Sequence, residues 1–186
     1  MVTEDKVRII LDKTATVDGI QKYCNIMKLV RAVDVTKDAD FQDNFRSFYQ
    51  LRRFYDDEFV QAYFEAMEEF KDDAELSFEK AFRRIQKING SCEVSFSSKL
   101  LNALKPSEPI WDSIVATKHF GCKLPGYSLK DRPTACIKRY GEYREAFMKY
   151  AESPEGKMIV RMFDEKFPKC GISDVKKIDF VLWQDK

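Results

Sequence analysis

The chain has little of the material from which metal centres and disulfide frameworks are built. Its 186 residues include a single histidine, His119, and five cysteines, none of them in a Cys-x-x-Cys pair. An odd number of cysteines argues against a disulfide framework, and one histidine is poor material for a zinc or iron–sulfur site. No Gly-x-Ser-x-Gly elbow surrounds a candidate hydrolase nucleophile. We therefore expect free thiols in a reducing compartment, with no metal and no cofactor.

Long hydrophobic runs are also missing, and glycine and proline are scarce. No stretch approaches the roughly 18 apolar residues of a membrane-spanning helix, and the first residues, MVTEDKVRIILDK, are charged too early for a signal peptide. The composition, with 7 Gly, 6 Pro, 44% hydrophobic and 34% charged residues, is typical of a helical globule. We expect a cytoplasmic protein, without a membrane partner, that folds as one domain over residues 1–186.

What the chain does have is apolar residues at helical spacing along most of its length. The spacing predicts helices over 17–33, 38–51, 56–70, 77–88, 98–104, 112–120, 133–153, 156–167 and 173–184. SCEVSF, residues 91–96, is predicted to be a loop, and the last helix is predicted to turn Val175, Ile178, Val181 and Leu182 inward. No alternating strand pattern is convincing. The predicted fold class is all-α, a single compact multi-helix domain.

The overall charge of +1 hides a strong segregation along the chain. Residues 38–79 carry 4 Lys or Arg against 13 Asp or Glu, whereas residues 80–150 carry 14 against 6. A basic region of this kind suits a protein with one face that meets a polyanion. Alternatively, helices of opposite charge pair with each other inside the fold, and both interpretations stay open.

One stretch, SFSSKLLNALKPSEPIWDSIVA over residues 95–116, places a lysine and an aspartate near the starts of two successive helices. Asp112 precedes an apolar run, where a helix N-terminus would hold its carboxylate ionised. Pro106 and Pro109 stiffen the turn between them. The pair offers an amine, Lys99, and a fixed carboxylate at a set distance.

The amine of Lys99 is expected to be pushed toward its neutral form. Ser97 or Ser98 can cap the helix, which would put Lys99 in its first turn, where the helix dipole disfavours an ammonium. Burial against Phe96 and Trp111 would act in the same direction, and a neutral lysine is a nucleophile. The simpler alternative is a surface lysine and an aspartate that serves only as a helix cap.

The order of a helix, a short hairpin loop, SKLLNAL and PIWDSIVA resembles the helix-hairpin-helix DNA glycosylase superfamily, which includes 8-oxoguanine and endonuclease III type enzymes. FRSFYQLRRF, CEVSFSSKLLNALKPSEPIWDSIVA and VKKIDFVLW are similar to a group of short bacterial proteins of this type. The resemblance implies a helix-hairpin-helix glycosylase-like fold with Lys99 and Asp112 as the catalytic pair. The chain departs from the superfamily in its hairpin, where INGSCEVSFSS replaces the glycine-rich turn, in its shorter lysine-to-aspartate spacing, and in lacking the four-cysteine iron–sulfur loop of some members.

The function implied by the resemblance is that of a base-excision DNA glycosylase, with or without AP-lyase activity, acting as a monomer on a damaged or modified base flipped from DNA. Lys99 would attack the sugar, and Asp112 would stabilise the cationic sugar or deprotonate the amine. Candidate phosphate contacts are Arg52, Arg53, Arg83, Arg84, Lys118 and His119, and candidate base-stacking residues are Trp111 and Phe120. Aromatic residues at helical spacing are more often core residues, so that alternative is kept.

Two other functions stay open. The first is a helix-hairpin-helix-like module that binds nucleic acid without catalysis, which the departures in the hairpin would suit. The second is a helical protein-interaction domain with the acidic block 38–79 as its contact surface. DNA affinity that falls steeply with added salt would separate the two.

Overall fold

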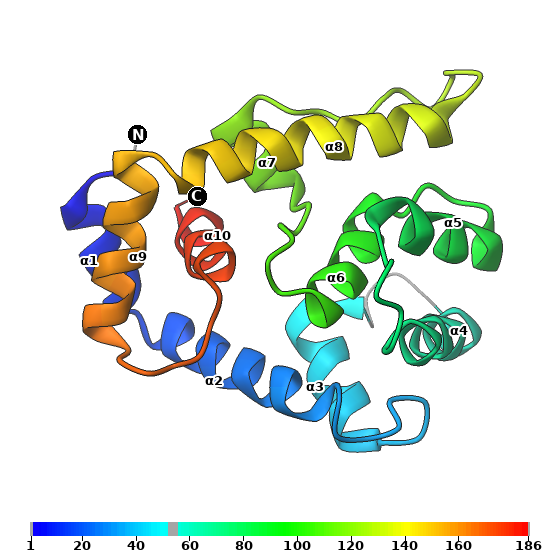
Figure 1. The fold of residues 1–186 in the computed structure, drawn as a ribbon, viewed down its shortest axis with the longest axis horizontal. Helices are drawn as coiled ribbons and strands as arrows, with labels where there is room; N and C mark the ends of the chain where they lie inside the picture. Colours follow the sequence, from blue (N-terminus) through cyan, green and yellow to red (C-terminus); the bar gives the residue numbers. More distant parts are fainter. Residues whose placement is uncertain (1, 52–55, 186) are drawn as a thin grey trace.

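The computed structural model describes residues 2–51 and 56–185, and in those residues it contains ten helices and no strand (Figure 1). The helices are α1 (Glu4–Asp12), α2 (Thr14–Leu29), α3 (Ala39–Tyr49), α4 (Asp57–Glu69), α5 (Phe78–Asn89), α6 (Val94–Leu104), α7 (Ser113–Phe120), α8 (Arg132–Ala151), α9 (Pro154–Lys166) and α10 (Asp174–Gln184). The predicted all-α class is confirmed. Eight of the predicted helices match an observed helix within a few residues at each end, and the predicted helix 98–104 matches α6 only in its C-terminal part.

The last helix, α10, lies in the middle of the fold rather than on its surface. It contacts α1, α7, α8 and α9, and Figure 1 shows it almost end-on among them. All eight residues from Val175 to Leu182 are buried, including two lysines and an aspartate. The prediction of one inward face was therefore too narrow, because a helix that is covered on several sides buries its polar positions as well.

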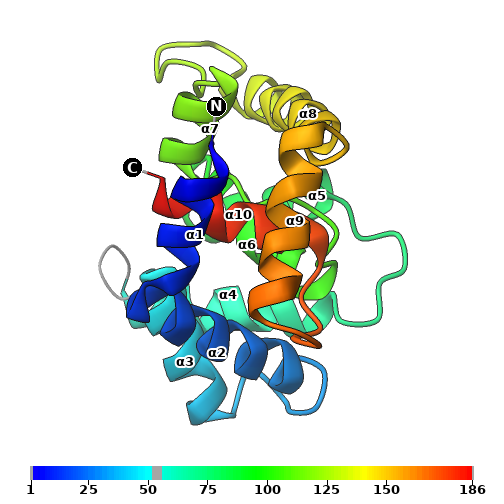
Figure 2. The ribbon, with the colours of Figure 1, turned by 90° about the vertical axis from the view of Figure 1, so that its left-hand side faces the viewer.

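The first helix, α1, was not predicted from the sequence. Its short apolar face, made by Val7, Ile10 and Leu11, is buried against α9 and α10, so the N-terminal segment lies beside the C-terminal helices (Figure 2). The Thr3 side chain caps the helix by accepting a hydrogen bond from the Lys6 backbone N–H. Nine residues are too few to be stable alone, so packing decides that this segment is helical.

Helices α3 to α6 form the other side of the molecule, and aromatic side chains fill its interior. The ring of Phe45 packs on those of Phe41, Tyr63 and Phe64, with centroids 5.7 to 5.8 Å apart. Tyr63 also donates a hydrogen bond to the backbone carbonyl of Phe96 in α6. This aromatic cluster fixes α3 and α4 against α6, the helix that carries Lys99.

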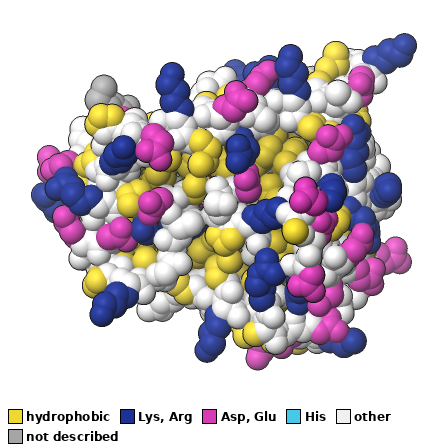
Figure 3. Space-filling model, in the orientation of Figure 1, with side chains coloured by type: hydrophobic (Ala, Val, Ile, Leu, Met, Phe, Trp, Pro, Cys, Tyr) yellow, Lys and Arg dark blue, Asp and Glu magenta, His cyan; other side chains and the backbone are white. Residues whose placement is uncertain are grey.

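The acidic and basic blocks of the sequence meet in the fold. Arg84 of α5 contacts Glu69 of α4 at 2.8 Å, and Lys80 contacts Asp73 at 3.2 Å. On the face shown in Figure 3, basic and acidic side chains are interspersed. These contacts favour the interpretation that helices of opposite charge pair with each other.

Candidate functional site around Lys99

The helix that carries Lys99 begins earlier than the sequence predicted. Helix α6 starts at Val94, with Glu93 as its N-cap, because Val94 and Phe96 are buried and extend the apolar face toward the N-terminus. Ser97 does not cap the helix, since its hydroxyl donates to the Glu93 carbonyl at 2.7 Å. Lys99 therefore lies beyond the first turn, and the prediction that the helix dipole acts on its amine was wrong.

The Lys99 side chain is half-buried, and its amine lies among aromatic rings. Its Nζ lies 4.4 Å from the centroid of the Phe96 ring and 5.8 Å from that of the Tyr49 ring. It donates one long hydrogen bond, 3.4 Å, to the backbone carbonyl of Tyr49. Burial lowers the pKa of Lys99 to about 8. The expected shift toward the neutral amine is present, and its cause is desolvation.

Asp112 is the N-cap of α7, as the sequence predicted. Its Oδ1 accepts hydrogen bonds from the backbone N–H groups of Ile114 at 2.8 Å and Val115 at 3.1 Å. The carboxylate raises the pKa of Lys99 and so partly offsets the effect of burial. The two described side chains form no ion pair, so the amine is not held by the carboxylate.

A hydrogen bond between their sequence neighbours sets Lys99 and Asp112 in a fixed relation. The backbone N–H of Trp111 donates to the Ser98 hydroxyl at 2.9 Å, and this hydroxyl donates to the Ser95 carbonyl at 2.8 Å. The residue before the lysine thus binds the residue before the aspartate. These two hydrogen bonds explain how Ser98, a polar residue, can be fully buried in α6.

The turn between α6 and α7 is held by side chains from two helices, α6 and α8, and from the segment before α10. Its carbonyl groups accept hydrogen bonds from Asn102 Nδ2 (Glu108, 2.7 Å), Tyr140 Oη (Pro109, 2.8 Å), Tyr143 Oη (Ile110, 2.9 Å) and Ser173 Oγ (Pro106, 2.6 Å). Arg144 adds an ion pair to the Glu108 carboxylate at 2.5 Å. The two prolines are therefore a minor part of what makes this turn rigid.

Sequence reasoning missed a second lysine and aspartate close to Lys99. Lys176 and Asp179 of α10 form an ion pair at 2.6 Å with side chains only 4% and 9% exposed. Lys176 Nζ lies 4.8 to 5.9 Å from the ring centroids of Phe180, Tyr23, Phe48 and Tyr49. The signal that would have found the pair is Lys-x-x-Asp inside the apolar segment VKKIDFVLW.

Tyr49 is the side chain that the two lysines share. Its ring centroid lies 5.8 Å from Lys99 Nζ and 5.9 Å from Lys176 Nζ. Its hydroxyl is buried and has no hydrogen-bond partner within the described part of the chain. Burial raises the pKa of Tyr49 well above its ordinary value, so the phenol stays neutral.

The predicted base-stacking residues lie in the aromatic core around α8. Trp111 is 2% exposed, and its ring centroid is 5.0 Å from that of Tyr143. Phe120 is half-buried and stacks on Phe147 at 5.4 Å. This placement favours the alternative that both are core residues, although stacking on a flipped base has not been tested and stays a prediction.

The predicted phosphate contacts do not come together at one place. Lys118 and His119, at the end of α7, face Asp185, with His119 Nε2 3.9 Å and Lys118 Nζ 3.5 Å from its Oδ2. Burial lowers the pKa of His119, so its imidazole is neutral at pH 7. Arg83 pairs with Glu79 on the surface of α5.

Arg84 pairs with Glu69 as described above, so each described arginine of this set already has an acidic partner. Arg52 and Arg53 lie outside the residues that the structure describes. Phosphate binding by these six residues stays a prediction.

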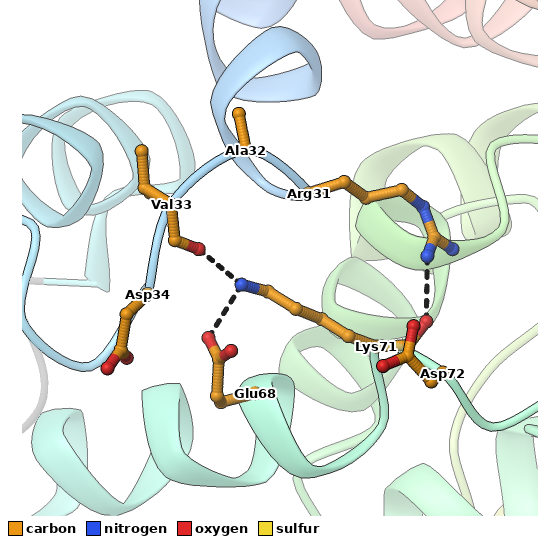
Figure 4. A pocket seen from close by; sticks show the side chains of 7 residues that line it. All are labelled: Arg31, Ala32, Val33, Asp34, Glu68, Lys71 and Asp72. Atoms are coloured by element: carbon orange, nitrogen blue, oxygen red, sulfur yellow. Dashed lines mark hydrogen bonds and ion pairs between the residues drawn. The ribbon is translucent and has the colours of Figure 1, made fainter.

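Two surface hollows lie away from Lys99 and Asp112. One, of about 320 Å³, lies between the α2–α3 connection and the end of α4 (Figure 4). Its charged groups bind one another, since Lys71 Nζ contacts the Val33 carbonyl and Glu68 at 2.6 Å, and Arg31 donates to the Lys71 carbonyl. The other, of about 550 Å³, lies between α4 and α5. In the first hollow Lys71 and Glu68 are thus paired with each other, and Asp34 and Asp72 complete the charged lining.

Comparison with protein-family models, curated proteins and solved structures finds no match to this chain. In the described residues, no helix has the length and apolar character needed to cross a bilayer. The same residues contain no cluster of three or more His, Cys, Asp or Glu side chains suited to a metal ion. The candidate site is thus defined by its own geometry.

Proposed function

We propose that this protein is a base-excision DNA glycosylase, with AP-lyase activity, that uses Lys99 as its nucleophile and Asp112 as its carboxylate. The observation that supports the proposal is a half-buried amine with a pKa lowered to about 8, together with an aspartate that caps the next helix and acts electrostatically on that amine. An amine with this pKa is partly neutral at pH 7 to 8, and a neutral amine is a nucleophile. The resemblance of PIWDSIVA and SKLLNAL to the glycosylase superfamily supplies the substrate class.

The proposed reaction begins with a nucleotide that is turned out of the duplex, because a stacked base is inaccessible. The Lys99 nitrogen bonds to C1′ of the sugar, and the bond from C1′ to the base breaks with its electron pair on the base. Asp112 accepts the proton that the amine gives up and can pass it to the departing base. The nitrogen lone pair then forms a double bond to C1′ as the C1′–O4′ bond breaks with its electron pair on O4′, which takes a proton from water. This opens the sugar ring and leaves a protonated Schiff base between Lys99 and C1′.

The Lys99 amine has to break one weak hydrogen bond before such an attack. The amine must turn away from the Tyr49 carbonyl, and a hydrogen bond of 3.4 Å is at the weak end of the observed range. Asp112 is held in place, because its Oδ1 accepts hydrogen bonds from two backbone N–H groups. The fixed carboxylate and the loosely held amine suit their proposed roles.

Borohydride trapping tests the proposal directly. Duplexes with 8-oxoguanine, uracil, hypoxanthine or an abasic site are incubated with the protein, and the reductant then converts any Schiff base to a stable protein–DNA adduct. We expect an adduct with at least one duplex, located at Lys99 by mass spectrometry, and its loss in Lys99→Ala. Absence of both an adduct and base release from every duplex would overturn the proposal.

Two variants serve as matched controls. Lys105→Ala removes the other lysine next to α6, which binds only backbone carbonyl groups of Ala74 and Leu76, and should leave trapping intact. Asp112→Asn keeps a side chain that can cap α7 but removes the charge, and should slow base release at least tenfold. Loss of trapping in Lys105→Ala would show that the assay reports folding rather than Lys99.

A second candidate is a module that binds nucleic acid without catalysis. The enclosure of the Lys99 amine and the replacement of the glycine-rich hairpin by INGSCEVSFSS favour it. This function requires DNA binding that weakens steeply with salt and is the same in Lys99→Ala as in the native chain, with no turnover.

A further inference from the structure

Lys176 and Asp179 stand out among the charged groups of the fold because they are buried in its middle helix. An ion pair that is removed from water costs desolvation of both charges, and replacement by apolar residues is often no less stable. Stability alone therefore does not explain why charges occupy these positions. Their position relative to Lys99 suggests another reason.

Two lysines meet at one aromatic ring. Tyr49 lies at the end of α3, with Lys99 of α6 and Lys176 of α10 each within 6 Å of its ring centroid. Lys176 is also bound to Asp179 at 2.6 Å, which fixes the position of its ammonium. Within residues 2–51 and 56–185, Lys99 has no such partner, and its amine donates a hydrogen bond to the Tyr49 carbonyl.

The charged groups that act on the Lys99 amine come from two other helices. Lys176 lowers the pKa of Lys99, and Asp112 and Asp179 raise it, with burial as the largest cause. Lys176 acts on Lys99 more strongly than Asp179 does. Tyr49 and Tyr23, the nearby titratable rings, stay neutral because burial raises their pKa values.

We propose that Lys176 is a positioning residue for Lys99: its ammonium, fixed by Asp179 beside the shared Tyr49 ring, disfavours a second positive charge and keeps the Lys99 amine available as a nucleophile. This inference rests on the proposed function, in which Lys99 is the nucleophile. Lys176 touches no substrate in this scheme, and it acts only through the protonation of Lys99. Asp179 makes it possible to bury an ammonium there at all.

The titration of Lys99 itself tests this role without DNA. In protein labelled with 13C-lysine, the Cε resonance of Lys99, assigned with Lys99→Arg, is followed by NMR from pH 6 to pH 11. We expect a midpoint near pH 8 in the native chain and a rise of about one unit in Lys176→Met, from loss of a nearby unit charge. The fraction of neutral amine at pH 7.5 would then fall five- to tenfold, and the rate of borohydride trapping would fall with it.

Two further variants separate the charge from the packing. Lys176→Arg keeps the positive charge and should leave the midpoint of Lys99 within a few tenths of its native value. Lys177→Met removes the neighbouring lysine of α10, which is also buried but binds Asp164 and Asp174, and should not move the midpoint. An unchanged midpoint in Lys176→Met, or an equal rise in Lys177→Met, would overturn the proposal.

A double variant controls for the possibility that Lys176→Met simply unfolds the protein. Lys176→Met leaves Asp179 without its partner, so Lys176→Met/Asp179→Asn, which removes both charges, is titrated beside it. The midpoint of Lys99 should rise in the double variant too, but less than in the single one, since the opposing carboxylate is also gone. A midpoint at or below the native value in the folded double variant would also overturn the proposal.

Failure of this inference is distinguishable from failure of the proposed function. A protein in which Lys176 controls the midpoint of Lys99 but which traps no DNA keeps the positioning role and loses the glycosylase. A protein that traps DNA through Lys99 with an unaltered midpoint in Lys176→Met keeps the glycosylase and loses the positioning role.

Discussion

Lys99 and Lys176 are both enclosed by aromatic rings, but the fold treats their charges differently. Lys176 lies against Asp179 at 2.6 Å, in the middle of α10, whereas the Lys99 amine, in the part of the chain that the structure describes, binds only a backbone carbonyl at 3.4 Å. The pKa of Lys99 is lowered to about 8 by burial. The charge of Lys176 is therefore paired inside the core, whereas Lys99 has the perturbed pKa that is typical of functional sites.

The largest expected effect on the free energy of unfolding comes from removing Asp179, the partner of Lys176. Asp179→Ala leaves a buried ammonium unpaired and should lower the free energy of unfolding by about 3–5 kcal/mol, measured by urea denaturation. Lys99→Met, the matched change at the other lysine, should alter it by less than about 1 kcal/mol at pH 10, where the Lys99 amine is neutral and little more than a weak hydrogen bond is lost. Equal losses in the two variants would remove the distinction between the lysines.

The dependence of the free energy of unfolding on pH tests the lowered pKa of Lys99. The folded chain releases the Lys99 proton near pH 8, whereas the unfolded chain holds it to about pH 10.4. Between these values the unfolded state binds more protons, so the free energy of unfolding rises with pH through Lys99. Below about pH 7 the destabilising contribution of the Lys99 ammonium is constant.

The contribution of Lys99 to this rise should be about 1–2 kcal/mol after allowance for its partial exposure. It is measured as the difference between the native chain and Lys99→Met in urea denaturation at pH 7.5 and pH 10. The subtraction removes the contributions of the buried tyrosines. A difference that does not change with pH would show that Lys99 has an ordinary pKa in the folded protein.

The smallest effect separates the two roles of Asp112. Asp112→Ala removes the cap of α7 and should lower the free energy of unfolding by about 1 kcal/mol, whereas Asp112→Asn keeps a capping side chain and should cost only a few tenths. Both variants remove the carboxylate that raises the pKa of Lys99, so both should lower the NMR midpoint of Lys99 equally. A midpoint shift in Asp112→Ala alone would mean that the cap, rather than the charge, acts on the amine.

The sequence predicted most of the helices because their apolar residues recur at helical spacing over long segments. It also predicted the Asp112 cap, since an aspartate before an apolar run has a local hydrogen-bonding role. It failed at α1, which is too short to show a clear period, and at the start of α6, where serines looked like caps. Those serines instead bond to carbonyl groups within α6, a preference that only the position of Val94 and Phe96 in the core decides.

The linear sequence by itself determined an all-α chain with an aspartate that begins a helix soon after a lysine. The tertiary structure decided why that lysine is unusual, because burial depends on contacts between α3, α6 and α10 that are 50 or more residues apart in the chain. It also brought Lys176 and Asp179 to the same ring. Helix formation and capping are local, so the sequence encodes them visibly, whereas desolvation and charge coupling arise only when distant segments pack together.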